Sequence, residues 1–267
     1  MTRPPARRAD VEPSKWPVGW QGAVYVQMRR LLDEYRLFFK EFRRTFHTTG
    51  AVLPSSPLLG RALARYVADR GSPDSPGGRR ILEVGPGTGA VTRQIARGMT
   101  AKDRLDLVEL NERFVQLLQR RFQQDPQLQP VASQATIMHL PLQDLDVAEP
   151  YDLIVSGLPL NNFSAHDVQM LLAAFQRLLR PGGTLSFFQY IAVRPLRRLW
   201  ANREEKQRLG RISQVLCEWL GQHEIQRQAI WINMPPAWVH HLQFAQQKQP
   251  QHIEAHQITQ TANDPAE

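Results

Sequence analysis

The sequence predicts an α/β protein in which a mostly parallel sheet is covered by helices on both faces. From Arg80 onward, short apolar runs typical of buried strands alternate with longer segments of helical period. Such alternation indicates strand–helix–strand units, which build parallel sheets. A glycine-rich turn that leads from the first strand directly into a helix is the second indication. Upstream of both, residues 24–46 have the period of one amphipathic helix.

Strands are predicted at residues 80–84, 105–109, 136–139, 152–156, 184–191, 224–232 and 237–244. Helices are predicted at residues 58–68, 90–99, 111–123, 165–179 and 203–220. The last two strands are separated only by Asn233-Met234-Pro235-Pro236, and proline cannot continue a strand ladder. We therefore expect these two strands to be antiparallel neighbours at the edge of the sheet.

Composition divides the chain into regions. Residues 1–22 are rich in Pro and Arg, and residues 245–267 are polar and rich in Gln, so both ends are predicted to be disordered. Residues 23–70 are predicted to form an amphipathic helical extension. A linker rich in Pro, Gly and Ser at 71–78 separates it from the main domain, which is predicted at 79–244.

The helix predicted at 24–46 carries an aromatic stripe beside several arginines. This composition is typical of a helix that lies on an anionic bilayer surface. The alternative, that the stripe packs on the rest of the protein, stays open, and both can hold together. The residues expected to contact the membrane are Tyr35, Phe38, Phe39, Phe42, Arg43 and Arg44.

Charge and cysteine content limit the classes of function. A net charge of +8 and a pI near 10.1 suit nucleic acid, an acidic membrane surface or an anionic small molecule. Cys217 is the only cysteine, which excludes a disulfide framework and a cysteine-based metal site, and the histidines lack metal-binding spacing. The sequence has no signal-peptide core and no apolar run of about 18 residues. We therefore expect a cytoplasmic protein, free of metal, that binds a membrane only peripherally, at its surface.

The glycine-rich turn is the strongest functional signal. Gly85, Gly87 and Gly89 follow a buried strand and precede a helix, so backbone N–H groups can approach a ligand closely. About twenty residues later, Glu109 ends the next strand, where a carboxylate can accept both hydroxyls of a ribose. A dinucleotide fingerprint fits the same residues, with Ala90 as its third position.

Glu83 favours a ligand with a ribose and an ammonium group over a dinucleotide with a pyrophosphate. An acid two residues before the first glycine would repel a pyrophosphate, but it would attract the ammonium group of a methionine moiety. Together with the segment Arg180-Pro181-Gly182-Gly183 before the fifth strand and the antiparallel pair at the end, this turn resembles the class I S-adenosylmethionine-dependent methyltransferases. The resemblance implies a Rossmann-like seven-stranded sheet and S-adenosylmethionine as the cofactor.

The residues that this resemblance assigns to the cofactor are Glu83, Gly85, Gly87, Gly89, Glu109, Leu110, Leu142, Ser156 and Gly157. One position departs from the usual pattern. After the third strand, these enzymes often carry an acid that holds the adenine amino group, and Pro141 falls there instead. Contact with adenine is therefore expected from neighbours such as Leu142 or Asp144.

The segment after the fourth strand bears on the methyl acceptor. Enzymes that methylate amino groups of nucleic acid carry Asn/Asp-Pro-Pro-aromatic or Asn-Leu-Pro-Tyr there, for hydrogen bonding to the base and stacking on it. Here Gly157 replaces the polar residue and Leu160 replaces the aromatic one. A ribosomal RNA adenine N6-dimethyltransferase is therefore the disfavoured alternative, and nucleic acid is disfavoured as a partner.

Four segments sharpen the resemblance to one family. Residues 46–56, 83–89, 156–160 and 233–237 together look like the bacterial phospholipid N-methyltransferases, which convert phosphatidylethanolamine toward phosphatidylcholine. The resemblance implies an anionic membrane and a phospholipid as partners. The substrate pocket that it implies consists of Leu158, Pro159, Leu160 and Asn233.

Methyl transfer is an in-line displacement, so the enzyme chiefly positions its reactants and excludes water. The acceptor amine must lose its proton, and burial near a positive sulfur favours the neutral form. Tyr190 is the polar candidate for holding this amine, although a core tyrosine is an equally good interpretation. A non-catalytic membrane-interaction protein on the same fold is the second alternative; the intact Glu83, glycines and Glu109 count against it.

Overall fold

The structure is a computed structural model, and it describes residues 56–69, 78–160, 163–191, 203–233 and 236–244. The amphipathic helix predicted at 24–46 lies outside these residues, as do both predicted disordered ends. The six residues expected to contact a membrane therefore lie outside them too, and that expectation stays a prediction.

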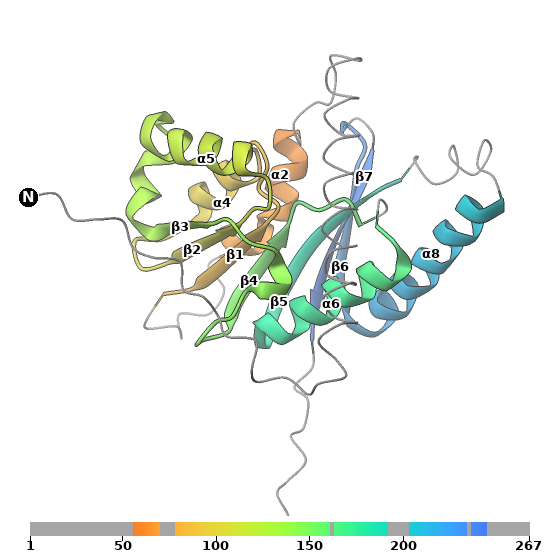
Figure 1. The fold of residues 1–267 in the computed structure, drawn as a ribbon. Helices are drawn as coiled ribbons and strands as arrows, with labels where there is room; N and C mark the ends of the chain where they lie inside the picture. Colours follow the sequence, from red (N-terminus) through yellow and green to blue (C-terminus); the bar gives the residue numbers. More distant parts are fainter. Residues whose placement is uncertain (1–55, 70–77, 161–162, 192–202, 234–235, 245–267) are drawn as a thin grey trace, which may run out of the picture.

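A seven-stranded sheet of order β3-β2-β1-β4-β5-β7-β6 forms the centre of the molecule (Figure 1). Its strands are β1 (Arg80–Val84), β2 (Arg104–Val108), β3 (Ala135–Met138), β4 (Tyr151–Ser156), β5 (Leu179–Tyr190), β6 (Glu224–Ile230) and β7 (Ala237–Gln243). All pairs are parallel except those of β7, which runs antiparallel to both β5 and β6. The predicted Rossmann-like sheet and its antiparallel final pair are confirmed.

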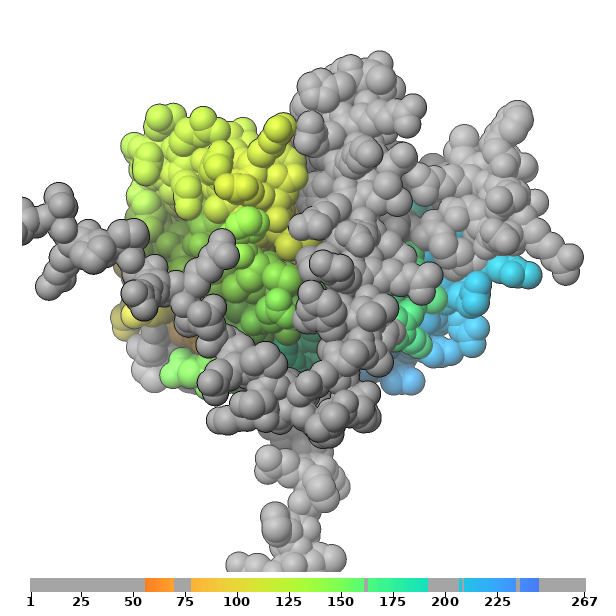
Figure 2. Space-filling view, viewed as in Figure 1, coloured from red at the N-terminus to blue at the C-terminus, as the bar shows by residue number. Residues whose placement is uncertain are grey.

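Helices cover both faces of this sheet, as predicted. They are α2 (Pro57–Leu63), α3 (Arg65–Ala68), α4 (Thr92–Gly98), α5 (Glu112–Gln124), α6 (Ala165–Leu178) and α8 (Arg203–His223), with short 3-10 helices η2 (Gln129–Gln134) and η3 (Leu142–Asp144). One apolar core joins the sheet to α6 and α8, and a second joins it to α2 through α5. In the space-filling view, α5 and α8 lie on opposite sides of the molecule (Figure 2).

The first described helices pack directly on the central sheet. Leu59, Leu63 and Val67 are almost fully buried in the same core as strand β1. Helix α2 begins at Pro57 because the hydroxyl of Ser56 accepts a hydrogen bond from the N–H of Leu59, the usual N-terminal cap. The single helix predicted at 58–68 is instead two, because the chain leaves helical geometry at Ala64.

The largest difference from the predicted boundaries is in β5. The Pro181-Gly182-Gly183 segment was expected to precede a strand at 184–191, but the strand already begins at Leu179 and includes this segment. Gly182 has a φ of 76°, and the register between β4 and β5 shifts between Tyr151 and Leu153, so the chain bulges without leaving the ladder. The other boundaries differ by smaller amounts, as expected for frayed element ends.

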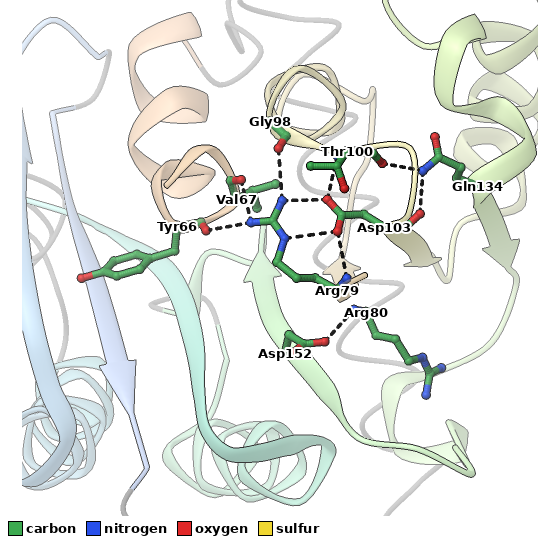
Figure 3. A network of polar contacts seen from close by, with 9 residues as sticks. All are labelled: Tyr66, Val67, Arg79, Arg80, Gly98, Thr100, Asp103, Gln134 and Asp152. Atoms are coloured by element: carbon green, nitrogen blue, oxygen red, sulfur yellow. Dashed lines mark hydrogen bonds and ion pairs between the residues drawn. The ribbon is translucent and has the colours of Figure 1, made fainter. Parts of the chain in front are cut away.

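A buried ion pair closes the amino-terminal edge of the sheet (Figure 3). The guanidinium of Arg79 lies 2.7 Å from the carboxylate of Asp103, which is only 2% exposed. Burial would raise the pKa of Asp103, but hydrogen bonds from Arg79 and Thr100 outweigh it and lower the pKa. The same guanidinium donates to the carbonyl oxygens of Tyr66, Val67 and Gly98. This network joins α3, α4, β1 and β2.

Replacing Asp103→Asn should lower the free energy of unfolding by about 3 kcal/mol, because it leaves the Arg79 charge buried without a counter-charge. Asp69→Asn is the control, since Asp69 is 68% exposed and lies 3.9 Å from Arg65. That variant should change stability by less than about 0.5 kcal/mol. Urea unfolding measures both, and equal effects of the two changes would contradict this account of the network.

Candidate functional site

The carboxyl ends of the parallel strands bring most of the predicted site residues to one edge of the sheet. Gly85 follows β1, Glu109 follows β2, and Gly157 follows β4, while Tyr190 is the last residue of β5. Because parallel strands end at the same edge, residues far apart in the sequence meet there. Open α/β sheets bind their ligands at this edge.

Three glycines shape the turn after β1. Gly85, Gly87 and Gly89 have φ values of 69°, 54° and 77°, a region that other residues rarely adopt. A Cβ on Gly87 would meet nothing within 4 Å, so this part of the backbone faces open space. The backbone of this turn is therefore open to the close approach of a ligand at Gly87.

Glu109 joins the end of β2 to this turn. Its carboxylate accepts a hydrogen bond from the N–H of Gly87 at 3.0 Å and one from the N–H of Asn111 at 2.8 Å. The side chain is 1% exposed, and burial raises its pKa although backbone donors oppose the shift. Glu109 is thus fixed beside the middle glycine, where a ligand seated on the turn would meet it.

Glu83 is the most unusual polar group of the site. Its side chain is fully buried, and neither carboxylate oxygen has a hydrogen-bond partner of acceptable geometry. Burial raises its pKa to about 8; the hydroxyl of Thr92 acts in the opposite direction, and the Glu109 charge adds to the rise. The hydroxyl of Thr92 lies beside this carboxylate and is itself buried, but it forms no hydrogen bond of acceptable geometry. An uncompensated buried acid is costly to a fold and marks a functional site.

The segment after β4 packs tightly against the glycine turn. The N–H of Gly157 donates to the carbonyl oxygen of Val84 at 2.8 Å. A Cβ on Gly157 would lie 2.6 Å from the carbonyl oxygen of Gly85, which is too close for any side chain. A Cβ on Gly85 would in turn lie 2.4 Å from the side chain of Leu158. Each glycine is therefore required by the other segment.

The residues predicted for a substrate pocket lie near this contact but face different ways. Leu158 and Leu160 are 2% and 0% exposed and belong to the core shared with α6 and α8. Pro159 between them is partly exposed. Asn233 is buried, and its side-chain oxygen accepts a hydrogen bond from the N–H of Ser56 at 3.2 Å. It ties the β6–β7 turn to the start of α2.

Tyr190 lies at the same edge, where its strand ends. It pairs with Ala237 of β7, and its ring contacts Phe188 edge-on at 5.2 Å. Burial raises the pKa of its hydroxyl, which therefore stays protonated at neutral pH.

His139, which was not predicted as a site residue, lies at the β3 end of this edge. A ring nitrogen of His139 lies 3.0 Å from the carbonyl oxygen of Leu110, the residue after Glu109. Pro141 precedes the 3-10 helix η3, and the side chain of Leu142 is buried in the core. Any contact of Leu142 with adenine would therefore come from its backbone N–H.

The structure also bears on the remaining expectations. His240 stacks on Phe187, while the ring of His241 contacts Tyr66 on the other face, as expected for neighbours on a strand. Within the described ranges, no three His, Cys, Asp or Glu side chains form a group that could hold a metal ion. No helix in the part of the chain that the structure describes could span a membrane.

The fold and this site define a class I S-adenosylmethionine-dependent methyltransferase. The family described as "Methyltransferase domain" matches residues 81–183, from β1 to the start of β5. An O-methyltransferase from Bacillus cereus, solved in complex with SAH, has a similar fold with a TM-score of 0.54 and 16% identity. That similarity covers 77% of this chain and 90% of the other. The predicted cofactor class is confirmed.

The chain is also similar in sequence to two curated proteins. The chain is 27% identical over 155 residues to the ornithine lipid N-methyltransferase of Singulisphaera acidiphila, over 58% of this chain and 77% of that protein. It is 29% identical over 123 residues to the tRNA1(Val) (adenine(37)-N6)-methyltransferase of Aeromonas hydrophila, over 40% of this chain and 50% of that protein. The second match thus spans only half of that enzyme.

Sequence reasoning missed Thr92 and Arg121. Thr92 opens α4 three residues after Gly89, and its side chain is buried beside Glu83, a contact that the helical pattern does not reveal. Arg121 donates to the carbonyl oxygen of Thr88 from the third turn of α5. Nothing in a helical pattern identifies which of several arginines reaches another element.

The buried acid predicts a pH dependence of the cofactor-free protein. With a folded pKa raised to about 8, Glu83 contributes stability that is fully present below the unfolded pKa of 4.5 and is lost as pH rises through 8. Glu83→Gln removes this loss, so the variant should gain stability over the wild type on the order of 1 kcal/mol per pH unit across that window.

Thermal unfolding at pH 5 to 9 measures this difference. The control is Glu149→Gln, because Glu149 is 77% exposed. That variant should follow the wild type at every pH. A Glu83→Gln curve parallel to the wild type would show that Glu83 is ionised in the folded protein.

Proposed function

We propose that this methyltransferase acts on the amine of phosphatidylethanolamine at a membrane surface, adding methyl groups toward phosphatidylcholine. The observation that supports this proposal most is that position 157 has no room for a side chain. Enzymes that methylate a base place a polar side chain there, whereas here the carbonyl oxygen of Gly85 occupies the space that any side chain would need. An acceptor amine that needs no base recognition suits this site.

The comparison with the ornithine lipid N-methyltransferase supports the same class of acceptor. Its name describes methylation of nitrogen on a lipid, which is the chemistry proposed here. The tRNA adenine relative favours a nucleic-acid substrate instead. Leu160, fully buried at the position where that class carries a stacking aromatic, argues against this alternative.

The site residues suit the cofactor by shape and charge. We assign the ribose hydroxyls to Glu109, the ammonium group to the buried acid Glu83, and the close backbone approach to Gly85, Gly87 and Gly89. A cation near Glu83 would lower its pKa and compensate the buried charge. Leu110, the backbone of Leu142, Ser156 and Gly157 complete the proposed set.

S-adenosylmethionine supplies a methyl group on a positively charged sulfur, which an uncharged amine can attack. The protein's part is to hold the amine in line and to exclude water. We assign Tyr190 to the amine, because its protonated hydroxyl can accept a hydrogen bond from an N–H and remains uncharged. The backbone from Ser156 to Leu160 would line the side of the pocket, with Pro159 as its exposed member.

Methyl transfer from labelled S-adenosylmethionine to vesicles tests the proposal. Vesicles of phosphatidylethanolamine and phosphatidylglycerol should yield labelled lipid that chromatography resolves as methylated phosphatidylethanolamine. Vesicles of phosphatidylcholine and phosphatidylglycerol are the matched control, because they contain no amine with a removable proton, and they should stay unlabelled.

Two outcomes would contradict the proposal. One is the absence of labelled lipid at saturating cofactor, and the other is labelling of ribosomal or transfer RNA in the absence of lipid. The second outcome would restore the adenine methyltransferase alternative. Tyr190→Phe tests the assigned role of the hydroxyl, since it should lower turnover about tenfold or more while cofactor affinity stays unchanged.

A further inference from the structure

Exposed apolar side chains gather at one groove of the molecule. Among the described residues, the exposed large hydrophobics are Leu58, Met170, Ile225, Trp231 and Ile232. Three of these, Leu58, Trp231 and Ile232, line one groove of about 690 Å³ between α2–α3 and the end of β6. Trp231 is 65% exposed and Ile232 is 82% exposed, which is unusual for side chains of this size.

This groove begins at the edge of the sheet that carries the candidate site. Trp231 and Ile232 directly follow β6, and the chain then enters β7 beside the end of β5. The N–H of Ile191 donates to the carbonyl oxygen of Pro236 at 2.8 Å, which joins the two strand ends. The exposed tip therefore lies on the same edge as Tyr190 and Gly157.

Neighbouring contacts hold this tip in place. The ring of Trp231 meets the ring of Trp238 edge-on at 6.5 Å, and the guanidinium of Arg227 lies 4.9 Å above the Trp238 ring. Asn233 ties the turn to the backbone of Ser56 at the start of α2. Contacts with β7 and with the start of α2 thus hold the apolar tip, while the side chains of Trp231 and Ile232 remain exposed.

The wall of the groove contributed by α2 and α3 is cationic. Arg61 follows Leu58 by three residues on α2, the spacing of one helical face, and Arg65 opens α3; all three side chains line the groove. Arg61 forms no ion pair with the residues that the structure describes. Arg65 lies 3.9 Å from Asp69, a mostly exposed and therefore weak pair. Two arginines against one aspartate leave the groove with a net positive charge.

We propose that the Trp231–Ile232 tip, together with Leu58 and Arg61, is a docking surface for an anionic phospholipid membrane. This proposal rests on the proposed function, because a lipid acceptor lies in such a surface. Tryptophan favours the membrane interface, an isoleucine beside it can enter the acyl region, and arginines pair with lipid phosphates. Docking here would turn the catalytic edge of the sheet toward the bilayer.

Cosedimentation of the full chain with vesicles of phosphatidylethanolamine and phosphatidylglycerol tests the surface. The double variant Trp231→Asp/Ile232→Asp should weaken the apparent affinity at least about tenfold, because it removes the burial of two large apolar side chains. Met170→Asp is the matched control, since Met170 is 44% exposed on α6, and it should bind as the wild type does. Ile232→Ser alone, at a highly exposed position, should weaken binding while leaving the melting temperature unchanged.

Replacing Arg61→Gln should weaken binding to these vesicles but not to vesicles of phosphatidylethanolamine and phosphatidylcholine. Wild-type affinity in the double variant would overturn the docking surface. So would a changed oligomeric state or a large loss of stability in Ile232→Ser, since either would show that protein covers the tip. Vesicle binding is read without methyl transfer, so a failure of the proposed function would appear separately, as bound enzyme that labels no phosphatidylethanolamine.

Discussion

The close contact between the turn after β1 and the segment after β4 is the constraint on which the rest of the site depends. Gly157 donates its N–H to Val84, and its missing side chain leaves room for the carbonyl oxygen of Gly85. The segments after β1 and β4 can therefore pack directly against each other, while the turn after β1 stays open at Gly87. Glu109, directly after β2, completes this arrangement by accepting a hydrogen bond from the N–H of Gly87. In the proposed function, this packing seats the cofactor and leaves no room for the side chain with which base methyltransferases recognise a base.

Most of the fold followed from local pattern. Strand and helix periods predicted each described strand and α-helix from Arg80 onward, because a sheet covered on both faces requires continuous apolar strands. The short 3-10 helices η2 and η3 were not predicted. Pro181-Gly182-Gly183 was misread, since glycine and proline mark turns and bulges alike, and only pairing with β4 separates the two. The break at Ala64 was also missed, because it depends on how α2 and α3 pack on the sheet.

The candidate site was predictable where a backbone conformation demands a residue type. Glycines at positive φ and acids beside them leave such a pattern in the sequence. The direction of each side chain leaves no such pattern: Leu158 and Leu160 were expected in a pocket, yet both pack into the core. The role of Asn233 in holding α2 depends on a contact with Ser56, 177 residues away, which no local pattern reveals.

The measurement that tests the central claim most directly is a calorimetric titration of S-adenosylmethionine into wild type, Glu109→Ala and the exposed control Glu149→Ala. We predict one cofactor per chain in the wild type and in the control. Glu109→Ala should raise the dissociation constant by about tenfold to a hundredfold, because hydrogen bonds to a charged acceptor are lost. Equal affinity in all three proteins would contradict the assignment of this strand edge as the cofactor site.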